Sequence, residues 1–238
     1  MNQNAKGVIN YHQETKHHFR RYARSPGYMD WQNQPIPFRT YEGADAVPLN
    51  LLKTDPPGGH RDLYRRAGHA SRPVDKSSIG SFLELSMGLS AWKAVGPSRW
   101  ALRMNPSSGN LHPTEVHLVI PESKDVIPGV YHYHSYQHAL ETRALLPEPL
   151  CGKIRRHFGA GMFLVGLSSI FWREAWKYGE RAFRYCNHDV GHALASLAFS
   201  ANLHGWKLSC LNRLSDADVN RILGFDRTDW KPLEAEHP

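Results

Sequence analysis

The sequence contains few cysteines, no long apolar run and no secretion signal. Its three cysteines, Cys151, Cys186 and Cys210, are too far apart for a CxxC pair, and their odd number argues against a disulfide framework. We therefore expect free thiols and a reducing, cytoplasmic compartment. No window approaches the roughly 18 apolar residues of a membrane-spanning helix, so we expect no membrane partner.

Two common nucleotide-binding patterns are also missing. No G-x-G-x-x-G or G-x-x-x-x-G-K-[ST] follows a predicted strand, which disfavours a Rossmann site and a P-loop. The 238 residues are 41% hydrophobic and carry a formal charge of +7, which suits one globular core and an anionic ligand. The basic clusters at 16–24 and 60–66 lack an accompanying basic helix or aromatic platform, so we expect no nucleic-acid partner.

Two parts of the chain differ in composition. Residues 1–60 are rich in Pro, Gly, Asn and Gln without a sustained period, and we interpret them as an extended N-terminal arm. Residues 61–238 alternate helical and strand patterns without a repeating βαβ order, which favours an α+β fold with a mixed sheet. The expected helices are 77–93, 148–158, 172–205 with a break at Gly179, and 215–224; the expected strands are 115–120, 129–135, 138–146, 161–171 and 206–214.

A polar loop, Asn105–Pro113, precedes the first of these strands. Its two prolines stiffen it, and Gly109 lets the backbone approach a ligand closely. Ser107, Ser108 and Asn110 place hydroxyl and amide groups in one arc that suits a flat, polar-edged ligand or a phosphate ester. From composition alone, an ordinary loop held together by Asx and Ser turns is an equal alternative.

Several separated motifs resemble one protein family. The loop PSSGNLHP resembles the PSxxNxQP loop of FMN-dependent nitroreductases and, more closely, the Pro-Ser-x-Gly loop of SagB-type dehydrogenases. GVYHYHSYQHALE resembles that family's GxYhYdpxxhxLe hairpin, and WKYGERAFRYCNHDVGHALASLAFSANLHGW resembles its KYGERAYRY helices. LGFD resembles its closing helix, and the N-terminal segment resembles the opening of tandem members with two such domains. On these motifs, the chain is identified as a member of the nitroreductase superfamily, SagB-type branch.

The resemblance implies a nitroreductase-like fold, with a mainly antiparallel sheet flanked by helices and FMN bound non-covalently at a dimer interface. Arg65 and Arg66 match an RRSxR segment and would hold the phosphate, with Arg72 a weaker candidate. The serine after the arginine pair is replaced by Ala67, which puts one contact in doubt.

The polar loop would bind the flavin itself. The resemblance assigns the ribityl and pyrimidine edge to Ser107, Ser108, Gly109 and Asn110. His112 stands where plain nitroreductases often have Gln, and it would donate to the flavin or cap the strand.

The resemblance assigns catalysis to Lys177 and Tyr178, a pair linked to azoline oxidation in the family. Chemically, a tyrosine beside an ammonium has a stabilised phenolate and can act as a general base. In the same helical stretch, Arg181 and Arg184 are expected to form ion pairs with Glu174 and Glu180.

The sequence leaves other readings open. His188 and His192 share a helical face as in zinc hydrolases, but no third ligand is evident, and we expect no metal. The histidines of YHYH are interpreted as the polar side of a half-buried hairpin.

The chain ends soon after the last predicted helix, which would suit a shortened domain or one half of a tandem protein. We expect an FMN-dependent oxidoreductase that acts as a homodimer or pseudo-dimer on an azoline peptide, nitroaromatic or quinone. The alternative is a flavin-free domain of the same fold that binds a partner.

Overall fold

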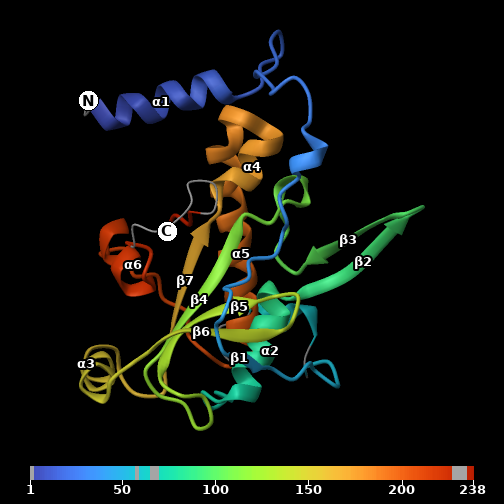
Figure 1. The fold of residues 1–238 in the computed structure, drawn as a ribbon. Helices are drawn as coiled ribbons and strands as arrows, with labels where there is room; N and C mark the ends of the chain where they lie inside the picture. The colour runs from blue at the N-terminus through green and yellow to red at the C-terminus, as the bar shows by residue number, and fades with distance from the viewer. Residues whose placement is uncertain (1–2, 57–58, 65–69, 227–234) are drawn as a thin grey trace.

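A five-stranded sheet forms the centre of the protein. The structure is a computed structural model that describes residues 3–56, 59–64, 70–226 and 235–238 (Figure 1). The strand order is β1-β6-β5-β4-β7, and every pair in it is antiparallel. The expected α+β class with a mainly antiparallel sheet is therefore confirmed. The strands are β1 Ala46–Pro48, β4 Thr114–Ile120, β5 Gly129–His134, β6 Ala139–Leu145 and β7 Leu164–Ser169.

The two faces of the sheet differ in chemistry because successive side chains of a strand point to opposite sides. On one face, Leu118, Tyr131 and Leu140 pack with apolar side chains of helices α2 (Lys76–Met87) and α5 (Ala182–Leu203), which lie behind the strands in Figure 1. On the other face, Val119 and Val130 contact a smaller apolar cluster that includes residues of α3 (Glu148–Phe158) and α6 (Asp216–Leu223). The rest of that second face carries buried charged and polar groups.

The helix expected at 77–93 ends early. Asp75, rather than Ser77 or Ser78, caps α2, and the backbone N–H of Gly88 donates to the carbonyl of Leu83 at its end. The chain then turns into a hairpin of β2 (Leu89–Val95) and β3 (Ser98–Arg103), which the sequence reading missed. The strand expected at 206–214 is also wrong, since these residues form no strand.

The other expected elements are present. The hairpin β5–β6, the strands β4 and β7, and helix α3 lie where the patterns placed them. The long helical stretch breaks at Gly179 into α4 (Phe171–Tyr178), a 3-10 turn (Gly179–Arg181) and α5. Ser215 caps α6 with a capping box, and Gly224 ends it in the left-handed conformation.

The N-terminal segment lies against the corner between α4 and α5. It begins with helix α1 (Gln3–Thr15), so its first residues are helical and not extended. Tyr11 Oη donates to the carbonyl of Glu180 at 2.8 Å, and Arg24 pairs with the carboxylate of Glu180 at 2.5 Å. Further along, Trp31 stacks edge-on against Trp176. These contacts tie residues 11–31 to the corner, while the domain boundary at residue 60 stays a prediction.

These contacts replace the ion pairs expected within the helical stretch. Arg181 donates from Nε to the carbonyl of Thr15 at 3.1 Å, and Arg184 donates from Nη2 to Thr15 Oγ1 at 2.9 Å. In the part of the chain that the structure describes, neither arginine pairs with Glu174 or Glu180, so that expectation is wrong.

Cys151, Cys186 and Cys210 are all free, and the first two are buried. Within the described ranges, no helix is both long and apolar enough to cross a membrane.

Candidate functional site

The polar loop is anchored on α5 by one buried carboxylate. Asp189 accepts hydrogen bonds from Ser107 Oγ at 2.7 Å, from Ser108 Oγ at 3.0 Å and from the backbone N–H of Ser108 at 3.0 Å. Asp189 is fully buried. The two serine hydroxyls therefore hold the loop in place, and their protons are directed into the protein.

The rest of the loop is held by its own side chains. Asn110 Nδ2 donates to the carbonyl of Ala101 at 3.0 Å, and Asn110 Oδ1 lies 2.9 Å from His112 Nε2. The backbone N–H of His112 donates to Ser107 Oγ at 2.8 Å. Burial and the nearby Arg103 lower the pKa of His112 to about 3, so its imidazole is neutral at physiological pH. His112 thus stabilises the loop through Ser107 and Asn110, and its contact with a flavin stays a prediction.

The structure brings the loop and the predicted catalytic pair together. Gly109 is exposed and has a φ of 63°, a conformation that favours glycine. A Cβ at this position would lie 2.7 Å from Tyr178 Oη and 2.9 Å from Lys177 Nζ. Only glycine therefore leaves room for the ends of both side chains beside the loop.

The phenol of Tyr178 is protonated at neutral pH. Burial is the main cause that raises the pKa of Tyr178 to about 12, and the charges of Glu174, Tyr185 and Asp189 raise it further. The expected stabilised phenolate is therefore wrong for this geometry.

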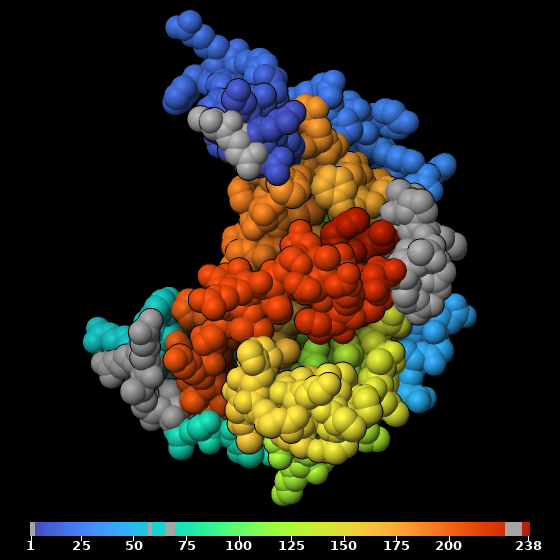
Figure 2. All heavy atoms as spheres, turned by 90° about the vertical axis from the view of Figure 1, so that its left-hand side faces the viewer, coloured from blue at the N-terminus to red at the C-terminus, as the bar shows by residue number. Residues whose placement is uncertain are grey.

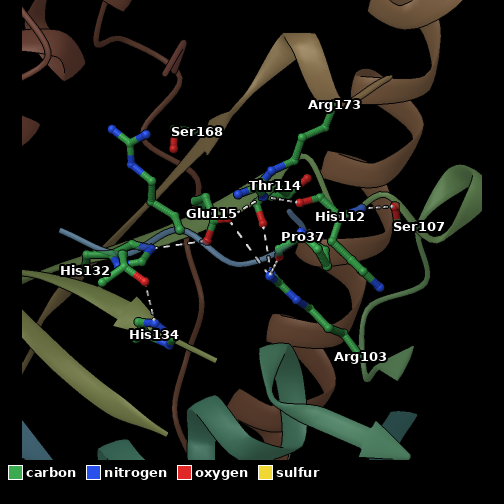
Figure 3. Close-up of polar contacts among 12 residues, drawn as sticks. Pro37, Arg103, Ser107, His112, Thr114, Glu115, His132, His134, Ser168 and Arg173 are labelled. Carbon is green, nitrogen blue, oxygen red and sulfur yellow. Dashed lines mark hydrogen bonds and ion pairs between the residues drawn. The ribbon is translucent and has the colours of Figure 1, made fainter. Parts of the chain in front are cut away.

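A buried network of charged side chains lies beside the end of the loop and the start of β4 (Figure 3). Arg173, at the start of α4, donates to the carbonyl of His112 at 2.6 Å and to the carboxylate of Glu115 at 2.5 Å. Arg103 donates to the carbonyl of Thr114 at 3.3 Å. Arg103 and Arg173 hold the pKa of Glu115 well below its usual range against the opposing effect of burial. The end of the loop, the start of β4 and the start of α4 are thus fixed relative to one another.

The same network contains the histidines of YHYH. His132 lies between two carboxylates, with Nδ1 2.7 Å from Glu141 and Nε2 3.1 Å from Glu115. His134 contacts Thr40 Oγ1 at 3.0 Å. Both imidazoles are buried, so the interpretation as the polar side of a half-buried hairpin is wrong.

The predicted phosphate ligands Arg65 and Arg66, with Ala67, lie outside the described residues. Their described neighbours contact the far end of α5: the carbonyl of Leu63 accepts from Asn202 at 2.9 Å, and the backbone N–H of Arg72 donates to the carbonyl of His204 at 3.0 Å. At about 1.5 Å of rise per residue, Asn202 lies roughly 20 Å along α5 from Asp189. Within one chain, the flanks of the arginine pair and the polar loop therefore lie at different places on the helix.

The zinc alternative gains no support. His188 and His192 are both exposed on α5. His192 Nδ1 lies 3.2 Å from the carbonyl of Pro106. Among the described residues, no group of three or more His, Cys, Asp or Glu side chains could hold a metal ion.

Sequence reasoning missed the residues that build the site from outside the loop. The sequence assigns no role in this site to Asp189, Glu115, Arg103 or Arg173, which the fold brings to the loop. Their partners are distant in sequence, and the available signal was a charged residue inside an otherwise apolar strand or helix face.

Comparisons with known proteins agree with this architecture. The model of the nitroreductase family, described as "Nitroreductase family", matches residues 70–234. No match was found among curated proteins. A crystal structure assigned to a nitroreductase from Anabaena variabilis has a TM-score of 0.68 and 25% identity, over 92% of this chain and 43% of that protein. This chain thus spans less than half the length of that relative.

Two further structures share the fold at lower identity. One is assigned to a nitroreductase from Ralstonia eutropha, with a TM-score of 0.54 and 16% identity, over 85% of this chain and 94% of that one. The other is the E. coli microcin synthetase McbBCD complex with truncated pro-MccB17 bound, with a TM-score of 0.50 and 18% identity, over 95% of this chain and 89% of the matched chain.

Proposed function

Because this chain belongs to the nitroreductase family, we propose that it is an FMN-dependent oxidoreductase that transfers hydride between an organic substrate and the flavin. Within the family we assign it to the SagB-type dehydrogenase-like proteins. The observation that carries the proposal is the approach of Lys177 and Tyr178 to Gly109. This approach places the residues that are expected to bind the cofactor beside the residues that are expected to transfer protons.

The residues around Gly109 fit a flavin in a specific way. The exposed backbone at Gly109 allows a flat ring system to approach, and Lys177 and Tyr178 supply donors beside it. Ser107, Ser108 and Asn110 would shape this surface through their bonds within the protein, and Arg65 and Arg66 would hold the phosphate. When bound, FMN would supply the hydride acceptor and donor at N5.

The site is proposed to be shared between two copies. The flanks of the arginine pair and the polar loop lie roughly 20 Å apart along α5. α5 exposes large apolar side chains, among them Phe183, Leu194 and Phe199. Figure 2 shows α4 and α5 in orange along a concave side of the molecule, between the arm in blue and the residues before α2 in teal. A second copy, or a second such domain, would cover this face and bring one loop near the other arginine pair.

The substrate is proposed to be an azoline peptide, a nitroaromatic or a quinone. One structural neighbour is a complex with a peptide bound, which supports the peptide class by analogy only. The free cysteines are consistent with a cytoplasmic location.

One observation favours the flavin-free, partner-binding alternative. The side-chain donors of Ser107, Ser108 and Asn110 are already used inside the protein. Ala67 stands where the family has a serine, which puts one contact with the flavin in doubt and so also favours the flavin-free alternative.

Reconstitution with FMN separates the two candidates. We expect the purified chain to turn yellow and, at about 100 times the Kd, to gain roughly 2.7 kcal/mol of stability, or about 5–10 °C in Tm. Arg66→Ala should gain less, whereas Arg61→Ala, an exposed arginine nearby, should match the wild type. A colourless protein whose Tm does not respond to FMN would instead support the partner-binding domain.

A further inference from the structure

The proposed catalytic tyrosine lies at the end of a helix. Tyr178 is the last residue of α4, and Gly179 follows it with a φ of 53°, so the chain leaves the helical path at this point. The last turn of a helix frays readily, because its last carbonyl groups have no partner within the helix. A hydroxyl that has to stay beside Gly109 therefore depends on support from outside α4.

Residues 11–31, which we call the N-terminal strap, contact the chain on both sides of this tyrosine. Just before it, Trp176 Nε1 donates to the carbonyl of Asp30 at 2.7 Å. Just after it, a Cβ at Gly179 would lie 3.3 Å from Pro26 Cγ, so the backbone packs closely against the strap. In Figure 1, the blue segment that follows α1 lies beside the orange α4. The strap therefore encloses the helix end that carries the tyrosine.

A stack of side chains links the strap to the tyrosine ring. The ring centroids of Tyr185 and Tyr178 lie 4.2 Å apart, at an interplanar angle of 42°. The guanidinium carbon of Arg181 lies 4.9 Å from the centroid of the Tyr185 ring. Arg181 Nε in turn donates to the carbonyl of Thr15, a buried strap residue, at 3.1 Å. Aromatic and cation–π contacts prefer particular geometries, so each side chain restricts the orientation of the next.

We infer that Arg181 and Tyr185 are positioning residues through which the strap holds Tyr178 beside Gly109. Their effect on turnover rests on the proposed function, whereas their effect on the position of the ring does not. A misplacement of about 1 Å can cost roughly a hundredfold in rate, so a stack that fixes the ring also sets turnover. A ligand or partner that displaces the strap would lower turnover without entering the flavin site, which makes the strap a point of regulation.

Arg184 provides a matched control, because it fastens the same strap by another route. Its Nη2 donates to Thr15 Oγ1 at 2.9 Å and to the carbonyl of His12 at 3.0 Å. Among the described residues, Arg184 makes no ring contact with Tyr178 or Tyr185. Arg184→Ala should therefore weaken the attachment of the strap and leave the stack intact.

The position of Tyr178 can be measured without cofactor, by fluorine NMR of the full chain labelled with 3-fluorotyrosine. The resonance of Tyr178 is the one that Tyr178→Phe removes. We expect Tyr185→Leu and Arg181→Ala to move this resonance toward that of the free amino acid, because the neighbouring ring is lost or turned away. Tyr185→Phe and Arg184→Ala should leave it in place. If Arg181→Ala does not fold, Arg181→Met removes the guanidinium and keeps most of the side-chain length.

Two results of the NMR experiment would overturn the inference. One is a resonance that does not move in Arg181→Ala or in Tyr185→Leu. The other is a resonance that moves as far in Arg184→Ala as in Arg181→Ala, because any loosening of the strap would then have the same effect as loss of the stack.

Steady-state kinetics of the FMN-loaded protein with a quinone test the consequence for turnover. We expect Arg181→Ala and Tyr185→Leu to lose about tenfold in kcat with little change in KM, and Tyr185→Phe to keep most of the wild-type kcat. Arg184→Ala should lower Tm about as much as Arg181→Ala does and keep the wild-type kcat; an equal loss of kcat in both would overturn the inference. A protein that binds FMN but turns over no quinone, nitroaromatic or azoline would refute the proposed function, whereas the fluorine resonance decides the position of Tyr178 by itself.

Discussion

Asp189→Asn should loosen the polar loop and, with it, the site. The carboxylate accepts from the hydroxyls of Ser107 and Ser108 and from the backbone N–H of Ser108, all at 2.7–3.0 Å. Hydrogen bonds to charged groups contribute about 1.5–3 kcal/mol each. An asparagine keeps one acceptor oxygen and presents an NH₂ group in place of the other, so the bonds lose their charge assistance and one serine hydroxyl has to turn from donor to acceptor.

The expected loss is smaller than the sum of the bonds. Removing the buried charge also removes its desolvation cost, so we expect about 2–4 kcal/mol. For a chain of this size, that corresponds to roughly 5–15 °C in Tm. Burial first, and the charge of Asp189 second, raise the pKa of the buried Glu174 to about 9, so the same variant should also lower this pKa.

Urea unfolding and FMN-dependent thermal shift provide the measurement. Asp45→Asn, at an exposed aspartate, is the matched control and should lie within about 0.5 kcal/mol of the wild type. The reasoning is refuted if Asp189→Asn costs less than about 1 kcal/mol and takes up FMN like the wild type, because the loop would then not depend on this carboxylate.

Two further substitutions test other parts of the structure. Gly109→Ala should cost only about 1 kcal/mol, from its φ of 63°, yet displace the ends of Lys177 and Tyr178 and lower turnover at least tenfold; melting curves and steady-state kinetics check both. Glu236→Gln should destabilise the fold by about 3 kcal/mol near neutral pH, since the carboxylate contacts His117 at 2.9 Å and Ser168 at 2.6 Å. Burial would raise the pKa of Glu236, but His117 holds this pKa at about 2, below the ordinary value of 4.5. The ionised Glu236 therefore stabilises the fold fully above pH 4.5, and this stabilisation is lost as the pH falls toward 2. Urea unfolding should show the stabilities of the wild type and Glu236→Gln converging over this range.

Local signals in the sequence predicted the elements that local interactions decide. The hairpin β5–β6 follows an alternating pattern, and α6 follows from a capping serine and a terminal glycine. By contrast, residues 89–93 continue the apolar pattern of α2, and only the cap at Gly88 and the pairing with β3 turn them into a strand. Residues 206–214 alternate well enough for a strand, but none pairs with them, and a strand without a ladder has no advantage over coil.

The residues of the candidate site likewise fall into two groups, those that the sequence reveals and those that only the fold brings together. Ser107, Ser108, Gly109 and Asn110 were found because they are contiguous, and the sequence resemblance added the Lys177 pair. Asp189 could not be found from spacing, because its partners lie more than 80 residues away and meet it only in the folded protein. The raised pKa of the half-buried Tyr178, which opposes the expected phenolate, likewise depends on packing that no local pattern records.

The proposed sharing of the flavin site between two copies predicts that flavin binding depends on protein concentration. Asp189 anchors the loop in the N-terminal half of α5, whereas Asn202 and His204 contact the flanks of the arginine pair at its C-terminal end, roughly 20 Å away. An antiparallel pairing of α5 with its copy would place opposite ends side by side, which one chain cannot do. We therefore expect the FMN-induced rise in Tm to shrink on dilution through the range where sedimentation shows the dimer dissociating. Full FMN binding by a demonstrated monomer would show that one chain closes the site alone, and that the exposed apolar face of α5 has another purpose.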